Sequence, residues 1–306
     1  MSERARRARE AQEAALQVSR EVLDHAAARR DEAWRDAAAG NRRRSLVVVA
    51  SPFLPGLVLA LLGLVSLVLL IVGLVLLAGW AVVAGMSWRA AVAGSGRRLG
   101  GLSPDEAARE GLVPELAAER LKDLTESLCF ALGLPVPALR ILVDSVPNAI
   151  STGGTPERAR LTLTSGLLAG LDRIELEGVL AHELAHLKRL DTLPAGLSGA
   201  LLRGGHLPFP GAGRVAVFLE GRDRELEADL AAVSVTRFPP GLLAALERIA
   251  KAPSVVPESV GTGLLAETGS QWLAPLAGPT VAPAGQHAAA EGTFGLGERL
   301  DVLREL

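Results

Sequence analysis

The feature that most constrains this chain is an apolar block from Leu46 to Met86 that contains no charged residue. As an α-helix, the block would be roughly 60 Å long, about twice the roughly 30 Å hydrocarbon core of a bilayer. That length is too great for a single straight span. A run of this kind also excludes an ordinary soluble protein, so the block predicts membrane attachment.

Two arrangements fit the length of the block. The chain either crosses twice, turning near Gly63–Ser66, or forms one tilted span from about Gly56, preceded by a re-entrant segment at Pro52–Pro55. The block begins 45 residues into the chain and far exceeds the apolar core of a signal peptide, so a cleavable signal peptide is not expected.

Basic residues on both sides of the block favour the hairpin. Three arginines precede the block and three follow it, at Arg42, Arg43, Arg44, Arg89, Arg97 and Arg98. Because basic residues concentrate on the cytoplasmic side, both flanks are expected in the cytoplasm, which requires an even number of crossings. We therefore expect a transmembrane helical hairpin over residues 45–88 in the cell (inner) membrane. This predicts a multi-pass protein in contact with the lipid bilayer.

Charge and cysteine content exclude several classes of protein. The chain has 32 basic and 34 acidic residues, a net charge of −2, which gives no support for nucleic-acid binding. Its single cysteine, Cys129, excludes a disulfide scaffold and a cysteine-based zinc finger. Cys129 has apolar neighbours in an expected helix, so a buried thiol is favoured over a nucleophile.

The remaining segments divide by composition. Residues 1–44 are rich in Ala, Arg and Glu and predict a charged cytoplasmic helix or tail; a short coiled coil or a contact with anionic lipid is the alternative. Residues 89–113 indicate a linker, in which Ser103 and Glu106 form a capping-box pattern. One domain is expected over 114–252, followed by a Gly-, Pro- and Ala-rich segment over 253–306 with a terminal helix.

Within the domain, apolar spacing predicts three helices, over 114–132, 172–190 and 223–235. Two segments are typical of strands, over 139–146 and 160–164, and a turn-prone stretch over 151–156 separates them. The expected fold class is therefore α+β, mainly helical with a small sheet.

The segment His182-Glu183-Leu184-Ala185-His186 fits the pattern His-Glu-x-x-His within an expected helix. Histidines four residues apart lie on one helical face, so both imidazoles can bind a single ion. Glu183 lies on the next face and can reach a water at that ion. The two histidines lie well away from the apolar stripe of this helix, which argues against placement in the core.

A catalytic zinc site needs a third protein ligand and an open position. The other histidines, His25, His206 and His287, fall in segments with weak structural signals. A better candidate is Glu225, which shares a helical face with Asp229 four residues later. In this interpretation Glu225 binds the metal and Asp229 accepts a hydrogen bond from a ligand imidazole.

In order and spacing, these residues resemble the HtpX-like membrane zinc endopeptidases, a family related to the CAAX prenyl proteases. The resemblance covers roughly residues 99–250. One signature runs through Pro147-Asn148-Ala149, Thr162-x-Thr164-x-Gly166-Leu167-Leu168 and Glu177–His186, then Asp191. The second, Arg-x-x-Glu-x-x-Ala-Asp, matches Arg222, Glu225, Ala228 and Asp229.

The resemblance implies a zincin-type metallopeptidase domain with one zinc ion per chain. It implies that His182, His186 and Glu225 are the zinc ligands and that Glu183 is the catalytic base. Around these ligands the expected supporting residues are Asp229, Asp191 and Arg222. It also implies a substrate-binding edge strand at Asn148, Ala149 and Ile150.

The chain departs from the family pattern in two places. Members usually carry a second hydrophobic pair between the two signatures, but the longest apolar stretch here, Leu193–Leu202, is too short to span a bilayer. We expect this insert to form a lid or an interfacial loop. Near the C-terminus, the family's His-Pro place is taken by Phe294-Gly295 or its neighbours, ahead of a helix containing Glu298-Arg299.

Together these observations predict a membrane-anchored zinc endopeptidase with a cytoplasmic catalytic domain. Its expected substrates are peptides or proteins, membrane proteins above all, and the resemblance adds a role in membrane-protein quality control. One alternative is a non-catalytic membrane scaffold or interaction protein that keeps the peptidase fold. A prenyl-protein processing enzyme is a further alternative, but the single apolar block counts against its enclosed membrane chamber. The oligomeric state is not predicted.

Overall fold

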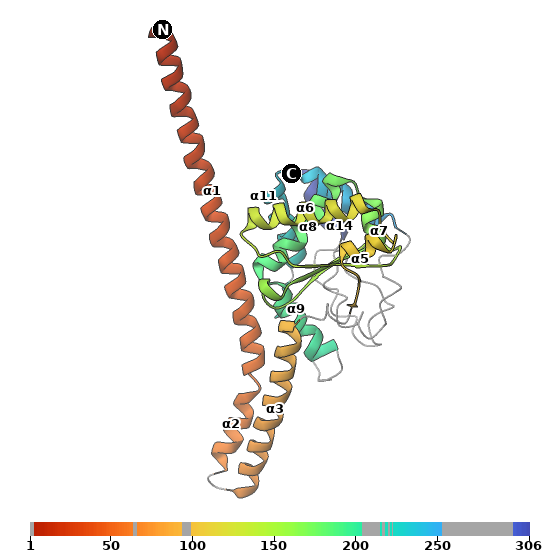
Figure 1. Cartoon of the computed structure of the whole chain (residues 1–306). Coiled ribbons are helices and arrows are strands. Elements are labelled where there is room, and N and C mark those ends of the chain that lie inside the picture. The colour runs from red at the N-terminus through yellow and green to blue at the C-terminus, as the bar shows by residue number, and fades with distance from the viewer. Residues whose placement is uncertain are drawn as a thin grey trace.

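A computed structural model describes residues 3–63, 66–93, 99–203, 215, 218–219, 221, 223–252 and 296–306, with side chains from residue 27 to residue 201 and in the later ranges. The chain begins with α1, one continuous helix of 48 residues from Glu3 to Ala50. Figure 1 shows α1 as a long rod that passes one side of the domain, with its N-terminal end well beyond it. The charged segment and the start of the apolar block therefore share a single helix.

The helix breaks at Pro52, which has no N–H to donate to the carbonyl of Val48. The hydroxyl of Ser51 donates to that carbonyl at 3.3 Å. The indole of Trp80, which lies far along the next long helix, donates to the carbonyl of Val49 at 2.8 Å. These two side chains satisfy backbone oxygens at the break, as a helix in an apolar environment requires.

After the break, α2 runs from Phe53 to Leu62 and α3 from Leu67 to Ala93. The two helices lie side by side, and the chain reverses direction between them (Figure 1). A Cβ atom at Gly73 would lie 2.5 Å from the backbone nitrogen of Ala60, so this contact requires glycine. The reversal falls in the stretch where the hairpin was expected to turn.

Two described helical stretches, Ala27–Leu62 and Leu67–Ala93, are long and apolar enough to cross a membrane. In each stretch, only 11% of the most apolar 18-residue segment is buried. The core helix of a soluble protein, by contrast, is mostly buried. Their exposed leucines and valines need an apolar environment. The number of crossings and the side on which the domain lies stay predictions.

The domain contains a three-stranded sheet in the order β1-β3-β2. Strand β1 pairs with β3 in parallel, and β2 pairs with β3 in the antiparallel sense, with Ile150 opposite Thr162. The strands are β1 (Ala138–Leu142), β2 (Ala149–Thr152) and β3 (Arg160–Thr164). The helices are α5 (Pro104–Arg109), α6 (Glu115–Leu132), α7 (Ser165–Gly170), α8 (Arg173–Arg189), α9 (Thr192–Ser198), α11 (Arg224–Thr236), α12 (Pro239–Ala250) and α14 (Leu296–Glu305), with a 3-10 turn at Pro156–Arg158 and a π-helical turn at Gly199–Arg203.

Helix α8 lies at the centre of the domain and packs against α6, α11, α12 and β2. The main core combines buried leucines of α8 with side chains of the sheet and of the surrounding helices, among them Leu121, Leu128, Leu161, Leu163, Leu176, Leu180, Leu184, Leu242 and Leu246. The predicted fold class, α+β and mainly helical with a small sheet behind N-terminal apolar helices, is confirmed.

A second apolar cluster joins the domain to the N-terminal helices. Leu193 and Leu197 of α9 pack with Ala91 of α3, and Trp80 and Trp88 border the cluster. Gly154, in the turn after β2, donates its N–H to the carbonyl of Val92 at 3.2 Å. The first part of the insert that was expected to form a lid or an interfacial loop is therefore a helix packed on α1 and α3.

The structure differs from the expected secondary structure in one strand boundary and in several elements that local spacing did not predict. Strand β1 ends at Leu142 rather than 146, because the carboxylate of Asp144 accepts from the N–H of Val146 and closes a turn. Helices α7, α9 and α12 were not predicted from local spacing. Strand β2 was indicated only by the family resemblance, and its last two residues fall in the stretch 151–156 that was expected to be a turn. The C-terminal residues 253–295 lie outside the described part of the chain, as do His206, His287 and the Phe294-Gly295 place.

Candidate metal centre

Helix α8 carries the two histidines, and both its ends are defined by short-range contacts. At its start, the carboxylate of Asp172 accepts from the N–H groups of Ile174 and Glu175, while Glu175 reaches back to the N–H of Asp172. At its end, Leu190 adopts a left-handed conformation with φ of 56°. This turn brings the next residue, Asp191, back beside His186, whose carbonyl accepts from the Asp191 N–H.

The histidines lie in the interior, which corrects one step of the sequence reasoning. Their angular distance from the apolar stripe was taken to place them outside the core, but His182 is 0% exposed and His186 is 4% exposed. The reason is that α8 is covered on every side from Gly178 to Leu187, since α11 and β2 pack on the faces that the stripe leaves. Periodicity along one helix cannot show this.

The two histidines and Glu225 of α11 converge on one point. The Nε2 atoms of His182 and His186 are 3.1 Å apart. Glu225 places Oε2 3.4 Å from Nε2 of His182 and Oε1 3.6 Å from Nε2 of His186. Zinc bonds of 2.0–2.1 Å at tetrahedral angles would separate ligand atoms by about 3.3 Å. The donor types and their spacing therefore fit a tetrahedral zinc site.

The other nitrogen of each imidazole faces a carboxylate. Nδ1 of His182 is 2.8 Å from Oδ1 of Asp229, and Nδ1 of His186 is 3.1 Å from Oδ2 of Asp191. A carboxylate beside Nδ1 holds the proton there, which leaves the Nε2 lone pair free to bind a metal. The structure thus brings together five of the residues that the sequence assigned to the metal and its support: His182, His186, Glu225, Asp229 and Asp191.

Glu225 is held between two arginines. Arg224 donates from Nε and from one terminal nitrogen to Oε1, at 3.1 and 2.7 Å, and Arg299 lies 3.4 Å from Oε2. Burial opposes ionisation of Glu225, but the charge of Arg224 and the two histidines hold its pKa well below the usual range. Glu225 is therefore an anion in the pH range in which a metal would bind.

Glu183 differs from every other carboxylate in the site. It is fully buried, and neither of its oxygens has a partner in good hydrogen-bond geometry among the described residues, although the Ser151 side chain of β2 approaches it. Burial raises its pKa, and the two neighbouring histidines offset this only in part. A buried carboxylate with no well-formed hydrogen bond is costly, so its presence here points to a chemical role rather than a structural one.

Arg299 is a site residue that the sequence analysis named only as part of the expected C-terminal helix, without a role in the site. It lies on α14 near the C-terminus, is 0% exposed, and donates to both oxygens of Asp229 at 2.6 and 2.8 Å. This bidentate pair fixes the carboxylate that orients His182. A signal was available, because Arg299 shares a helical face with the buried Leu303. Arg222, the expected supporting arginine, lies outside the described residues.

The charges around the histidines favour a cation. Four carboxylates face three arginines there: Glu183, Asp191, Glu225 and Asp229 against Arg189, Arg224 and Arg299. Burial alone would lower the pKa of His186, but the charge of Glu225 and the hydrogen bond to Asp191 raise it to about 9. Asp229 and Glu225 likewise outweigh burial and raise the pKa of His182. When the two imidazoles lose their protons to bind a metal, a divalent cation would supply positive charge beside these carboxylates in place of the protons.

Of the expected substrate residues, Ala149 and Ile150 begin β2, an edge strand of the described sheet, and Asn148 directly precedes it. All three are fully buried. The side-chain oxygen of Asn148 accepts from the N–H of Ala149, and its backbone pairs with Thr164. Strand β2 packs directly against α8, which carries the metal-binding histidines. Its position fits the expectation, and peptide binding along it stays a prediction.

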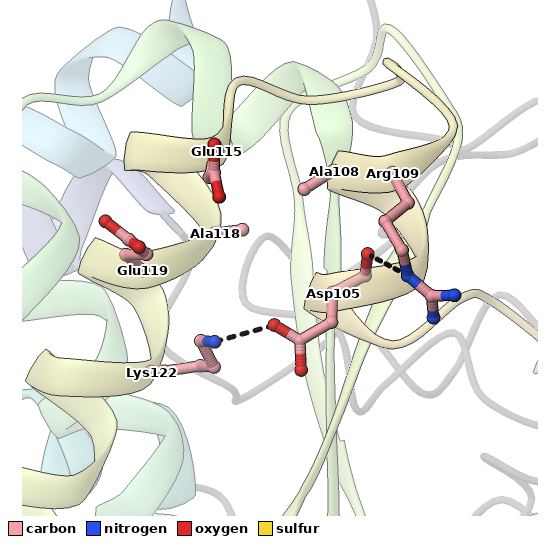
Figure 2. Close-up of a pocket in the computed structure, with 7 residues that line it drawn as sticks. All are labelled: Asp105, Ala108, Arg109, Glu115, Ala118, Glu119 and Lys122. Carbon is pink, nitrogen blue, oxygen red and sulfur yellow. Dashed lines mark hydrogen bonds and ion pairs between the residues drawn. The ribbon is translucent and has the colours of Figure 1, made fainter.

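A hollow on the surface is separate from the metal centre. It encloses about 250 Å³ between α5 and α6 and is lined by charged side chains of both signs (Figure 2). Lys122 reaches across it to Asp105 at 2.6 Å, and both side chains are exposed. None of the lining residues lies on α8, α11 or α14. The hollow therefore takes no part in the metal site.

Comparison with known proteins identifies the family. The family model described as Peptidase family M48 matches residues 115–274, just over half of the chain. The chain belongs to peptidase family M48. The matched range contains α8 and α11, and hence both signatures on which the predicted HtpX-like membership rested.

Among curated proteins, this M48 chain is similar to several that are named Protease HtpX homolog, which confirms an HtpX-like member of M48. The protein of Dictyoglomus turgidum is 34% identical over 163 residues, which is 43% of this chain and 54% of the relative. That of Listeria monocytogenes is 32% identical over 173 residues, 42% of this chain and 57% of the relative. That of Pyrococcus furiosus is 44% identical over 95 residues, 30% of this chain and 33% of the relative.

The chain thus spans about half the length of the first curated M48 relatives that it matches. No solved structure matches it.

Proposed function

We propose that the chain is a membrane-anchored, zinc-dependent endopeptidase. The observation that carries the proposal is the pairing of a three-ligand cluster, His182, His186 and Glu225, with a buried carboxylate, Glu183, whose oxygens have no well-formed hydrogen bond among the described residues. A structural metal site closes its coordination with protein ligands, whereas a catalytic site keeps a position open and needs a base beside it. Membership of M48, a family of peptidases, supports the same conclusion.

In this mechanism the residues of the chain have distinct roles. Bound zinc would lower the pKa of water to about 7 and polarise the peptide carbonyl. Glu183 takes a proton from the attacking water and passes it to the leaving amine. His182, His186 and Glu225 hold the ion. Asp229 and Asp191 keep both Nδ1 atoms protonated, and Arg299 keeps Asp229 in place.

The substrate is a peptide in extended form that adds to the edge of β2. Strand β2 pairs with β3 on one side and packs against α8 on its face, so a peptide along it would pass close to Glu183. Backbone hydrogen bonds would supply much of the affinity, and selectivity for side chains would be weak. Because Asn148, Ala149 and Ile150 are buried, this binding also requires that the edge open.

The N-terminal helices place this activity at a membrane. Their exposed apolar surface fits a hairpin of two spans, and the arginines on both flanks favour a cytoplasmic position for the domain. An anchored peptidase meets membrane-bound substrates at a high local concentration. Membrane proteins are therefore the proposed substrates, and their quality control is the proposed role.

The test is the Glu183→Gln variant of the full chain, purified in detergent and assayed for zinc content and for degradation of casein. We expect zinc binding to be retained and cleavage to be lost, because the amide cannot accept the proton. Glu177→Gln is the matched control, since Glu177 lies on the same helix and is only partly buried. Cleavage by zinc-loaded Glu183→Gln protein would refute the mechanism. A wild-type protein that binds no zinc and degrades nothing would favour a scaffold.

A further inference from the structure

The N-terminal helix contributes a side chain to the surroundings of the metal site. Asn41 lies on α1, five residues before the apolar block begins, and is 2% exposed. Its amide nitrogen donates to Oδ1 of Asp191 at 2.5 Å and to the carbonyl of Arg189 at 2.9 Å. Its amide oxygen accepts from Arg44. The donor and the acceptor of this amide are therefore both used.

The two oxygens of Asp191 have different partners. Oδ2 faces Nδ1 of His186 at 3.1 Å and accepts from Nε of Arg189 at 3.0 Å. Oδ1 accepts from Asn41, and no other described residue donates to it. If the carboxylate turned about its bond to Cβ, both sets of contacts would be lost. The amide of Asn41 therefore fixes the orientation in which Asp191 can hold His186.

Helix α1 is itself firmly docked on the domain. Two turns before Asn41, Trp34 is 4% exposed and lies beside Lys188 of α8, whose Nζ is 5.6 Å from the centre of the ring. One turn after Asn41, Ser45 is fully buried and donates to the Asn41 carbonyl. Figure 1 shows α1 passing this side of the domain before it continues towards α2. Trp34, Asn41 and Ser45 form one buried face of α1.

We propose that Asn41 is a positioning residue of the zinc centre, through which the membrane-anchoring helix α1 holds Asp191 and, by way of Asp191, the ligand His186. The identity of the metal rests on the proposed function. Because α1 is continuous from Trp34 to Ala50, a shift or rotation of the anchoring helix moves the amide relative to Asp191. The attachment to the membrane and the geometry of the metal site then depend on one rigid element.

The experiment measures zinc affinity, by competition with a chromogenic chelator, for the full chain in detergent. Loss of a hydrogen-bonding partner around a metal ligand typically weakens metal binding about 10–100-fold. For Asn41→Ala we expect a loss of about tenfold, at the lower end of that range because Asn41 acts through Asp191. Asn41→Leu keeps the branched shape of the side chain and removes the donor, so the same loss is expected. Ser45→Ala is the matched control on the same buried face, expected within about twofold of wild type.

A double variant separates positioning from general destabilisation. Asp191→Ala removes the group through which Asn41 acts, so adding Asn41→Ala should cost no further zinc affinity. If the fold-losses in zinc affinity of the two single variants multiply in the double variant, the proposal is overturned. Wild-type affinity in both Asn41→Ala and Asn41→Leu would also overturn it.

The outcomes for the proposed function are distinct. A wild-type protein that binds zinc, responds to Asn41 as expected and cleaves no casein would refute the peptidase and support the positioning role. A wild-type protein that binds no zinc would overturn both. Casein cleavage that depends on Glu183, together with zinc affinity that does not respond to Asn41, would overturn only the positioning role.

Discussion

Replacing Arg299 with methionine removes the charge that holds Asp229 beside His182. The arginine is fully buried and makes two hydrogen bonds of 2.6 and 2.8 Å to that carboxylate. Two unit charges about 4 Å apart attract each other by about 4 kcal/mol at an effective dielectric constant of about 20. Breaking a buried pair by removing one partner typically costs about 3–5 kcal/mol, because the other charge stays buried. We therefore expect Arg299→Met to lower the free energy of unfolding of the metal-free domain by about 3–5 kcal/mol.

The assay is urea denaturation of the metal-free chain in detergent, followed by circular dichroism. Arg304→Met is the matched control, because Arg304 lies on the same helix and pairs with Glu247 and Asp301 while half exposed. Exposed pairs contribute little to stability, so the control should lose far less than Arg299→Met. Equal, small losses for both variants would refute the idea that Arg299 holds the site together. The double variant Asp229→Asn with Arg299→Met should recover part of the loss, since no unpaired charge stays buried.

Three further predictions follow from the geometry of the site and its packing. Asp229→Asn should weaken zinc binding about 10–100-fold in a chelator competition, with the exposed Asp301→Asn unchanged, because the anion beside Nδ1 of His182 is lost. Because the pKa of His186 is raised from 6.5 to about 9, its stabilising contribution to the metal-free protein is complete below pH 6.5 and is lost as the pH rises to about 9. The urea midpoint of the metal-free protein should therefore fall over that range while the affinity for zinc rises. A urea midpoint and a zinc affinity that rise or fall together would contradict the raised pKa of His186. Gly178→Ala would place a Cβ atom 2.7 Å from the backbone nitrogen of Leu242 and should cost about 1–3 kcal/mol in thermal or urea unfolding, whereas Gly170→Ala, with open space around it, should cost less.

Contacts between near neighbours in the sequence were predictable. The two histidines share a face because they are four residues apart, and the same spacing places Glu225 and Asp229 together on α11. The capping box of Ser103 and Glu106 forms as expected. Such features depend only on helical geometry, so they do not require knowledge of the fold.

Contacts between distant parts of the chain were not predictable. Arg299 meets Asp229 across 70 residues and Asn41 meets Asp191 across 150, and no local pattern encodes either pair. Weak signals existed in each case. Arg299 lies on the apolar face of its helix with Leu303, and Asn41 shares a face with Trp34 and Ser45. A polar residue on a buried face indicates a partner without naming it.

Local composition failed to predict several elements, among them α12 and β2, the second of which only the family resemblance indicated. Strand β2 is only four residues long and is followed by glycine, so its sequence is typical of a turn. Helix α12 begins with two prolines and a glycine, which favour a loop, although proline is well accommodated in the first turn of a helix. Packing of α12 against α8 supplies the stability that its first residues lack.

The most direct test of the central claim is a zinc titration of the metal-free chain with casein cleavage measured at each point. Cleavage should rise in proportion to bound zinc and stop rising at one equivalent per chain, since His182, His186 and Glu225 form one three-ligand site among the described residues. Cleavage by protein that holds no metal, or a protein that binds one equivalent of zinc without gaining any peptidase activity, would contradict the account.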